Sequence, residues 1–278
     1  MQDGKSIISG WSDGKIRAFL PQSGKLLYVI NDAHNHGCTS VTATTDGERI
    51  ISGGAEGEIR IWRISKQTQV MEASMKEHRS RVWSIQISKD NSQAVSASSD
   101  GSCIIWDLKT RTRLLCLFES TAFKQAILNT EEYQILTAGS DRKITYWEKF
   151  DGQIIRSIEG SDRELNTLDI THEGKHFISG GQDGRLKIWN YDEGICYFEG
   201  EGHSGSINKV KISPDQRKII TVGSEGAIFF WDMPESIVKD KVQPELPTLT
   251  KEPQKEEKSV KGSVKSSVKG SVKPTIKK

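Results

Sequence analysis

The chain has 278 residues, with 39 basic and 37 acidic side chains that give a formal net charge of +2 at pH 7, and 35% of its residues are hydrophobic. This composition is typical of a soluble protein with a core and excludes disorder throughout. The longest apolar runs are far shorter than the roughly 18 residues of a membrane span, and the opening MQDGKSIISGW lacks the apolar stretch of a signal peptide. We therefore expect a cytoplasmic protein without a membrane partner.

The four cysteines are widely spaced and include no C-x-x-C pair. They are Cys38, Cys103, Cys116 and Cys196. A disulfide framework or a zinc site needs closer or paired spacing. We expect all four to be reduced, buried small hydrophobic residues.

A unit of about 42 residues repeats six times. The segments that align without gaps are DGKIRAF, EGEIRIW, DGSCIIW, DRKITYW, DGRLKIW and EGAIFFW, which end at Phe19, Trp62, Trp106, Trp147, Trp189 and Trp231. Each unit contains short β-branched or alternating runs between Gly, Asp, Asn and Ser, which predicts four short strands per unit. Such sheets bury both faces only by packing around an axis, so the repeat predicts an all-β propeller.

The first and last units are incomplete. KSIISGW at the start of the first unit aligns with RIISGG of the second, so the first unit lacks its opening strand. The last unit ends at Trp231-Asp232, with only Ile237 and Val238 to supply a poor final strand. Because open sheet edges are a pairing liability, we expect six recognisable blades over residues 1–232 that belong to a seven-bladed ring or to a longer chain.

Residues 233–278 differ in composition from the rest. They contain 11 Lys and 6 acidic residues, a net of +5, and the triplet Ser-Val-Lys four times. Low hydrophobicity with many Lys, Ser, Gly and Pro cannot offset the entropy of ordering. We expect a Lys/Ser/Val-rich disordered tail, and nucleic-acid binding through it is disfavoured because no aromatic residues are interleaved for base stacking.

A second pattern runs through the repeat. Each aligned segment begins with Asp or Glu. A Ser or Thr stands four positions before that acidic residue in every unit, and in three units a histidine stands 22 positions before it, namely His34, His78 and His203. Together with Gly202-His203 and the Trp-Asp pairs at Trp106 and Trp231, this pattern resembles the WD-repeat family of propellers. The resemblance implies a hydrogen-bonded tetrad of His, Ser or Thr, Asp and Trp inside a blade, complete as His78, Ser96, Asp100 and Trp106. The fourth and fifth units have Ser120 and Ser161 in place of His, so packing should hold those blades.

Catalysis and metal binding find little support. Ser96, His78 and Asp100 could be mistaken for a nucleophilic triad, but the hydroxyl and acid recur in every unit and no Gly-x-Ser-x-Gly elbow is present. His34 with His36, and His172 with His176, do not share a helix face as zinc ligands need. We expect a protein that is not an enzyme, without a metal, cofactor or small-molecule substrate.

Two departures from the repeat are candidate protein-binding residues. Trp11 stands where the other units have Gly or Ser, and it either packs inside the propeller, which we favour, or anchors a partner. Arg79 and Arg81 lead into Trp83, and Arg with Trp is enriched in interfaces. A solvated loop with Trp83 covering its blade is an equal alternative.

Several longer runs, among them DGERIISGGAEGEIRIWRI and DITHEGKHFISGGQDG, resemble a two-propeller branch of the WD-repeat family found in cilia and flagella. This resemblance implies a noncatalytic scaffold of the axoneme that contacts tubulin and neighbouring proteins inside doublet microtubules. The alternative is a WD-repeat adaptor such as a substrate receptor of a ubiquitin ligase. Such receptors often carry W-D-x-R, and here Lys109 takes the last place in Trp106-Asp107-Leu108-Lys109, which weakens that alternative.

Overall fold

The computed structural model describes residue 1 and residues 4–65 and 68–239. Within them the chain forms six antiparallel sheets, one for each predicted unit, and the four-stranded prediction is confirmed for the four central blades. Blade 2 comprises β4 (Cys38–Ala43), β5 (Arg49–Gly54), β6 (Glu58–Ile64) and β7 (Gln69–Lys76). Blade 3 comprises β8 (Val82–Ile87), β9 (Gln93–Ser98), β10 (Ser102–Asp107) and β11 (Thr112–Phe118).

The next two blades repeat this order. Blade 4 comprises β12 (Phe123–Leu128), β13 (Gln134–Gly139), β14 (Lys143–Glu148) and β15 (Ile154–Glu159). Blade 5 comprises β16 (Leu165–Ile170), β17 (His176–Gly181), β18 (Arg185–Asn190) and β19 (Cys196–Glu201). The turn between the two middle strands needs a left-handed residue, which is Gly57 at φ 84° in blade 2 and Arg142 at φ 69° in blade 4.

The first and last blades have three strands each, as the sequence predicts. Blade 1 comprises β1 (Ile7–Gly10), β2 (Ile16–Phe19) and β3 (Leu26–Ile30), and it lacks the innermost strand. Blade 6 comprises β20 (Ile207–Ile212), β21 (Lys218–Gly223) and β22 (Ile228–Asp232), and it lacks the outermost strand. In the described residues β1 and β22 are therefore unpaired on one edge.

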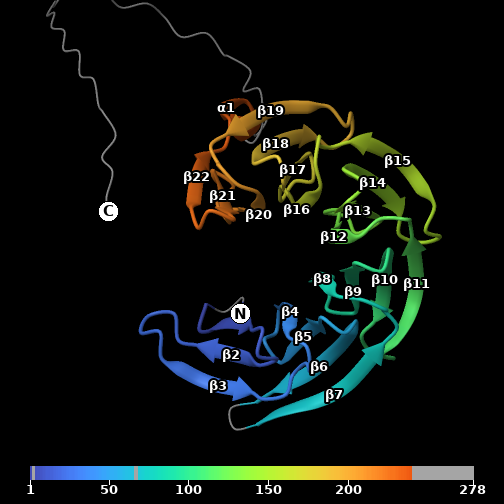
Figure 1. Cartoon of the computed structure of the whole chain (residues 1–278), viewed down its shortest axis with the longest axis vertical. Helices are drawn as coiled ribbons and strands as arrows, with labels where there is room; N and C mark the ends of the chain where they lie inside the picture. The colour runs from blue at the N-terminus through green and yellow to red at the C-terminus, as the bar shows by residue number, and fades with distance from the viewer. Residues whose placement is uncertain (2–3, 66–67, 240–278) are drawn as a thin grey trace, which may run out of the picture. The chain divides into compact units, whose positions relative to one another are not determined.

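The blades follow one another around an axis (Figure 1). The innermost strands pack in sequence order, β4 against β8, β8 against β12, β12 against β16 and β16 against β20. No extensive strand contact in the described residues joins blade 1 to blade 6, and Figure 1 shows these two blades on opposite sides of an opening. The six-bladed propeller fold, with incomplete first and last blades, is thus confirmed.

The hydrophobic core lies between neighbouring blades. Between blades 2 and 3, for example, Ile59 and Ile61 meet Val82 and Trp106. Equivalent clusters fill the other four junctions. Each blade therefore depends on its neighbour for burial of its apolar face.

The segment after the last strand corrects one expectation. Ile237 and Val238 do not supply a final strand, because Glu235–Lys239 forms the short helix α1. Met233 and Ile237 are buried in the cluster that also contains Ile207 and Ile219 of blade 6. The helix packs against this core, whereas an extended segment at the blade edge would not. This packing explains why a helix forms instead of a strand. The packed region thus continues past residue 232.

The cysteine prediction is half right. All four are free, but only Cys38 and Cys103 are buried, whereas Cys116 is exposed and Cys196 is intermediate. The latter two lie on the outermost strands β11 and β19, where one face of the strand meets solvent. The disorder predicted for residues 233–278 is wrong for residues 233–239, which contain helix α1, and the rest of that prediction lies outside the described residues. Within the described ranges, no helix is long and apolar enough to cross a membrane.

Candidate protein-binding site

The predicted tetrad residues of blade 3 lie together in its interior. Trp106 donates its indole N–H to Ser96 Oγ at 2.8 Å, and His78 Nε2 lies 2.7 Å from the same oxygen. His78 Nδ1 lies 2.6 Å from Ser102 Oγ, which in turn donates to Asp100 Oδ1. One neutral tautomer satisfies this chain, with Nδ1–H donating to Ser102 and the Ser96 hydroxyl donating to Nε2. The network ties the loop before β8 to β9 and β10.

Asp100 anchors the other end of this network. Its Oδ2 accepts the backbone N–H of Arg79 at 2.6 Å and lies 3.5 Å from His78 Nδ1. Burial alone would raise the pKa of Asp100, but the nearby His78 imidazole and the hydrogen bonds from Ser102 and backbone N–H groups outweigh it and hold that pKa below its ordinary value. The carboxylate is therefore ionised at neutral pH.

Two further blades contain the same arrangement with Glu in place of Asp. In blade 2, His34 bridges Ser52 at 2.8 Å and Glu56 at 2.7 Å. In blade 6, His203 bridges Thr221 and Glu225. The indoles of Trp62 and Trp231 donate to those hydroxyls. The expectation of one complete set was too narrow, because the longer Glu side chain still reaches the imidazole.

Blades 4 and 5 lack the histidine but retain part of the network. Trp147 and Trp189 donate to Thr137 and Ser179 at 2.8 and 2.9 Å. Ser161, at the histidine position of blade 5, donates to Asp183 at 2.6 Å. Aromatic packing adds to this, since Phe177 stacks on Trp189 and meets Tyr146 edge-on.

Trp11 lies in blade 1 and is 45% exposed. Its indole N–H donates to Ser9 Oγ at 2.8 Å, and the Arg17 guanidinium lies 4.5 Å from its ring centroid. The packing that we favoured is therefore only partial, because blade 1 lacks the inner strand that would cover the ring. Phe19 replaces the usual Trp in this blade, so Ser9 accepts from Trp11 instead.

A β-bulge in the innermost strand of blades 2 to 6 creates a second feature. The pairing register skips the second residue of each of these strands, which are Thr39, Trp83, Lys124, Asn166 and Asn208. Bulges re-aim a side chain out of the regular alternation. All five line one cavity of about 570 Å³, together with Lys209 and Gln182, and we call these five residues the bulge ring.

The bulge ring is cationic around its one aromatic residue. Lys124 Nζ lies 4.0 Å from the centroid of the Trp83 ring, and Arg81 Cζ lies 4.9 Å from it. The Trp83 indole donates to Ser99 Oγ at 2.5 Å, which fixes the ring. No carboxylate lines this cavity in the described part of the chain. Two cations held against an indole in this way favour an anionic or aromatic partner.

The structure only partly unites the predicted binding residues. Arg81 and Trp83 lie together, whereas Arg79 is exposed and donates its backbone N–H to Asp100. Trp11 belongs to blade 1 and does not line the cavity. Lys124 was missed, although it stands 41 residues after Trp83, one repeat later.

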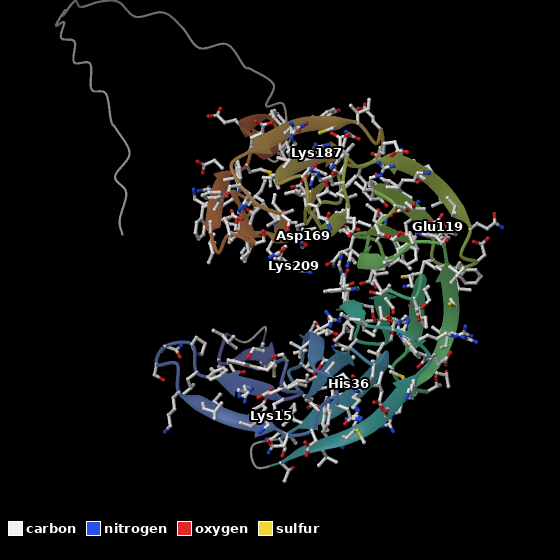
Figure 2. The ribbon with its side chains drawn as sticks, viewed as in Figure 1. Lys15, His36, Glu119, Asp169, Lys187 and Lys209 are labelled. Carbon is white, nitrogen blue, oxygen red and sulfur yellow. The ribbon has the colours of Figure 1, made fainter. Side chains whose placement is uncertain are left out.

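Lys209 also lines this cavity. It donates to Gln125 of blade 4 and also lines a neighbouring cavity of about 680 Å³ with Lys211 and Asp169. Desolvation by the surrounding strands and the positive charge of Lys211, against the opposing effect of Asp169, together lower the pKa of Lys209 to about 8. Figure 2 shows Lys209 and Asp169 on the inner side of blades 5 and 6.

Comparison with known families agrees with this geometry. A family model described as "WD domain, G-beta repeat" matches residues 24–63, 69–107, 152–190 and 194–232, more than half of the chain. The chain belongs to the WD-repeat family. The resemblance of the tetrads and the Trp-Asp pairs is therefore confirmed at the level of the family.

Within the WD-repeat family, the chain is similar to cilia- and flagella-associated protein 52. It is 53% identical to the Mus musculus protein over 180 residues, which cover 64% of this chain and 29% of that protein. Over 178 residues, 64% of this chain and 29% of the relative, it is 52% identical to the Chlamydomonas reinhardtii protein. Transducin beta-like protein 3 of Bos taurus is 29% identical over 139 residues, 44% of this chain and 17% of that protein. The chain thus matches less than a third of the length of these relatives.

The WD-repeat architecture accounts for the residues that resemble catalytic or metal-binding groups. Ser96 is fully buried, so its hydroxyl cannot meet a substrate. His34, Glu56 and Glu58 place three possible metal ligand atoms within 4.8 Å of one another. However, both ring nitrogens of His34 are already hydrogen-bonded, and Glu58 pairs with Arg60. These residues serve the tetrad and its surroundings.

Proposed function

We propose that this chain is a noncatalytic scaffold of the ciliary or flagellar axoneme that binds tubulin and neighbouring proteins and stabilises doublet microtubules for motility. The observation that carries the proposal is the identity of about 52% to cilia- and flagella-associated protein 52 across most of the propeller. The same name applies to the relatives from Mus musculus and Chlamydomonas reinhardtii, which supports a role in cilia and flagella. The compartment that we propose is accordingly the axonemal cytoskeleton.

The perimeter of the propeller supports a scaffold. The outermost strands of blades 1 to 5 each expose large apolar side chains, which include Leu26, Leu27, Val70, Met71, Leu114, Phe118, Ile154, Ile155, Tyr197 and Phe198. Extended exposed apolar surface marks protein interaction sites more often than free surface. A propeller that is surrounded by neighbours in an assembly would keep this perimeter covered.

The cavity that the bulge ring lines supports an acidic partner such as tubulin. Trp83, Lys124 and Lys209 present an indole and two amines, and Trp and cationic side chains can anchor contacts with acidic surfaces. We therefore propose Arg81, Trp83 and Lys124 as the contact residues, with Arg79 beside them. Trp11 is a separate candidate on blade 1.

Localisation tests the ciliary part of the proposal. A fluorescently tagged full chain is expressed in a ciliated cell line, and the cilia are extracted with detergent to leave axonemes. We expect the tag to remain with the axonemes. A tag that is spread through the cytosol or released entirely by detergent would contradict the proposal and favour a general WD-repeat adaptor.

A further inference from the structure

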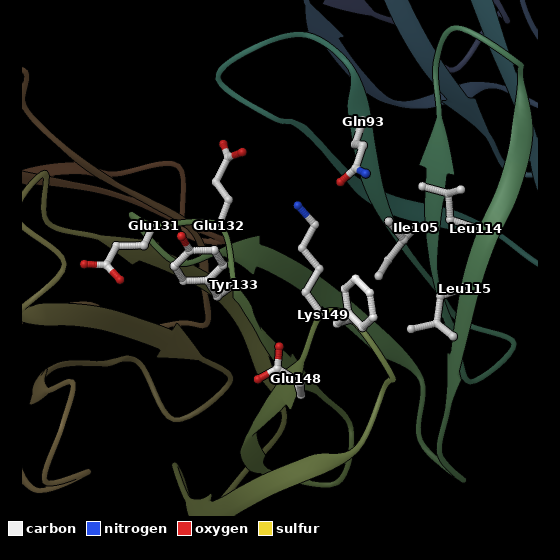
Figure 3. Close-up of a pocket in the computed structure, with 10 residues that line it drawn as sticks. Gln93, Ile105, Leu114, Leu115, Glu131, Glu132, Tyr133, Glu148 and Lys149 are labelled. Atoms are coloured by element: carbon white, nitrogen blue, oxygen red, sulfur yellow. The ribbon is translucent and has the colours of Figure 1, made fainter.

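A groove lies between blades 3 and 4, away from the bulge ring. Its volume is about 610 Å³. Blade 3 contributes Ile105 from β10 and Leu114 and Leu115 from β11, and blade 4 contributes Tyr133 and Phe150 from the turns that flank β13 and β14. Figure 3 shows the side chains of the two blades facing each other across this groove.

The apolar side chains of the groove are unusually accessible. Phe150 is 95% exposed, Tyr133 is 67% exposed and Leu114 is 50% exposed, while Ile105 beneath them is buried. Exposure of two aromatic rings and a leucine around one hollow is typical of an interaction site. The turn that carries Phe150 is held against blade 3, since a Cβ on Gly152 would lie 3.1 Å from Leu115 Cδ2. The two blades are therefore in close contact at this turn.

The charge of the groove is negative. Glu131, Glu132 and Glu148 line it against the single cation of Lys149. Glu132 accepts the backbone N–H of Lys89 at 2.7 Å, but Glu131 and Glu148 have no side-chain partner in the described part of the chain. Two carboxylates beside exposed rings favour a ligand that is cationic and apolar at once.

Gln93 adds an independent observation. Its Oε1 atom is buried and has no hydrogen-bond partner among the described residues. Figure 3 shows its carboxamide on the wall of the groove opposite Lys149. Buried acceptors are rarely left unpaired in proteins. Rotation of the Gln93 carboxamide toward the groove would let an incoming N–H donor satisfy this acceptor.

We propose that this groove binds a partner protein segment in which an apolar side chain lies next to Lys or Arg. The apolar side chain packs between Leu114 and Phe150, the basic side chain pairs with Glu131 or Glu148, and a backbone N–H reaches Gln93. The groove thereby gives the chain a second docking site, of opposite charge to the bulge ring. This inference does not depend on the ciliary placement.

Selection from random peptides tests the inference. Phage that display random 12-residue peptides are first depleted on a Phe150→Ala/Glu131→Lys double variant of the full chain and then selected on the unchanged full chain. We expect the recovered peptides to be enriched in Lys or Arg next to Leu, Phe or Trp. Recovery of acidic peptides, or of no peptide that distinguishes the two proteins, would overturn the inference.

Anisotropy of the best recovered peptide, labelled with fluorescein, gives the size of the effect. Phe150→Ala and Glu131→Lys should each weaken its binding by about tenfold, as for an interface anchor. The exposed residues Phe118 and Asp162 lie outside the groove, so Phe118→Ala and Asp162→Lys are matched controls that should leave binding unchanged. Equal loss in test and control variants would contradict the inference. A dimer of the full chain that dissociates on Phe150→Ala would also contradict it, since a second copy would then be the occupant.

Discussion

Trp11 Nε1 donates to Ser9 Oγ at 2.8 Å, so the indole makes in blade 1 the hydrogen bond that Trp62, Trp106 and Trp231 make to the equivalent hydroxyl in blades 2, 3 and 6. In blades 2 and 6 a glycine stands at the position of Trp11, and the histidine of the blade lies directly against that glycine. A Cβ on Gly54 would lie 2.3 Å from His34 Nδ1, and a Cβ on Gly223 would lie 2.4 Å from His203 Nδ1. A large side chain at this position therefore occupies the place of the histidine. Blade 1, which has no inner strand and no histidine loop, tolerates it.

Replacement of Trp11 should loosen blade 1. Trp11→Ser removes the indole donor and the surface on which Arg17 lies, and we expect a loss of about 1–2 kcal/mol in the unfolding free energy. Trp11→Phe keeps the ring but not the N–H, so it should lose about half of that. Amide hydrogen exchange of β1 and β2 measures the effect. Unchanged protection in Trp11→Ser would show that the indole does not hold β1 and β2 together.

The Ser96 hydroxyl should contribute more to the free energy of unfolding than an ordinary surface hydroxyl. Ser96→Ala leaves Trp106 Nε1 and His78 Nε2 without their partner in a buried site. The expected cost is about 2–3 kcal/mol in the free energy of unfolding, measured by urea denaturation. Ser23→Ala, at an exposed serine, is the control and should cost less than about 0.5 kcal/mol. Equal costs for the two variants would contradict the role of the tetrad.

Acidification should destabilise the protein through His34. Burial lowers the pKa of His34, and Glu56 opposes the shift without cancelling it. A histidine with a lowered pKa in the folded state binds fewer protons there than in the unfolded state, whose histidine pKa is about 6.5. Its contribution to stability is thus present above pH 6.5 and is lost as the pH falls toward the folded pKa.

Comparison with a variant isolates this effect. Urea denaturation at pH 7.5 and 5.5 should show a larger fall in unfolding free energy for the unchanged chain than for His34→Gln, which has no imidazole to protonate. His36→Gln, at an exposed histidine nearby, serves as the matched control. The same pH dependence for His34→Gln and the unchanged chain would refute the assignment.

Lys209 should react with amine reagents at a lower pH than most lysines. With a pKa of about 8 it is close to half deprotonated at pH 8, whereas a lysine at the usual pKa of about 10.4 is less than about 1% deprotonated. Brief treatment with acetic anhydride at pH 8, followed by peptide mass spectrometry, should therefore modify Lys209 before another exposed lysine, such as Lys25. Lys211→Met removes a neighbouring positive charge, raises the pKa and should slow the reaction. Preferential modification of Lys25 would contradict the burial effect.

The repeat predicts the fold well because its period is a property of local chemistry. The strand and turn residues recur in every unit, so the six blades and both missing strands follow from alignment alone. Helix α1 was missed because Met233 and Ile237 are buried against a core assembled from blades 5 and 6, and that contact is not visible in a five-residue segment.

The candidate site was harder to predict because a β-bulge interrupts the regular alternation of side chains along the strand. Side-chain orientation is inferred from that alternation. Trp83 and Lys124 are 41 residues apart, and ordinary strand alternation does not indicate that both point into one cavity. The unit alignment places them at the same position, which is the signal that could have found Lys124. Arg79 was included because it is close to Trp83 in sequence, but the turn directs its backbone to Asp100 instead.

Assembly of tubulin in the presence of the chain tests the central claim most directly. Tubulin is polymerised with the full chain already present, so that sites on either wall of the microtubule are accessible. The amount of chain in the microtubule pellet is measured across a salt series. The same measurement is made for Lys124→Glu and, as a charge control, for Asp162→Lys. We expect the full chain and the control to sediment with microtubules at salt that screens loose surface attraction, and Lys124→Glu to lose most of this binding. Failure of the full chain to sediment at any salt concentration, or equal binding by all three proteins, would contradict a scaffold that holds tubulin through its bulge ring.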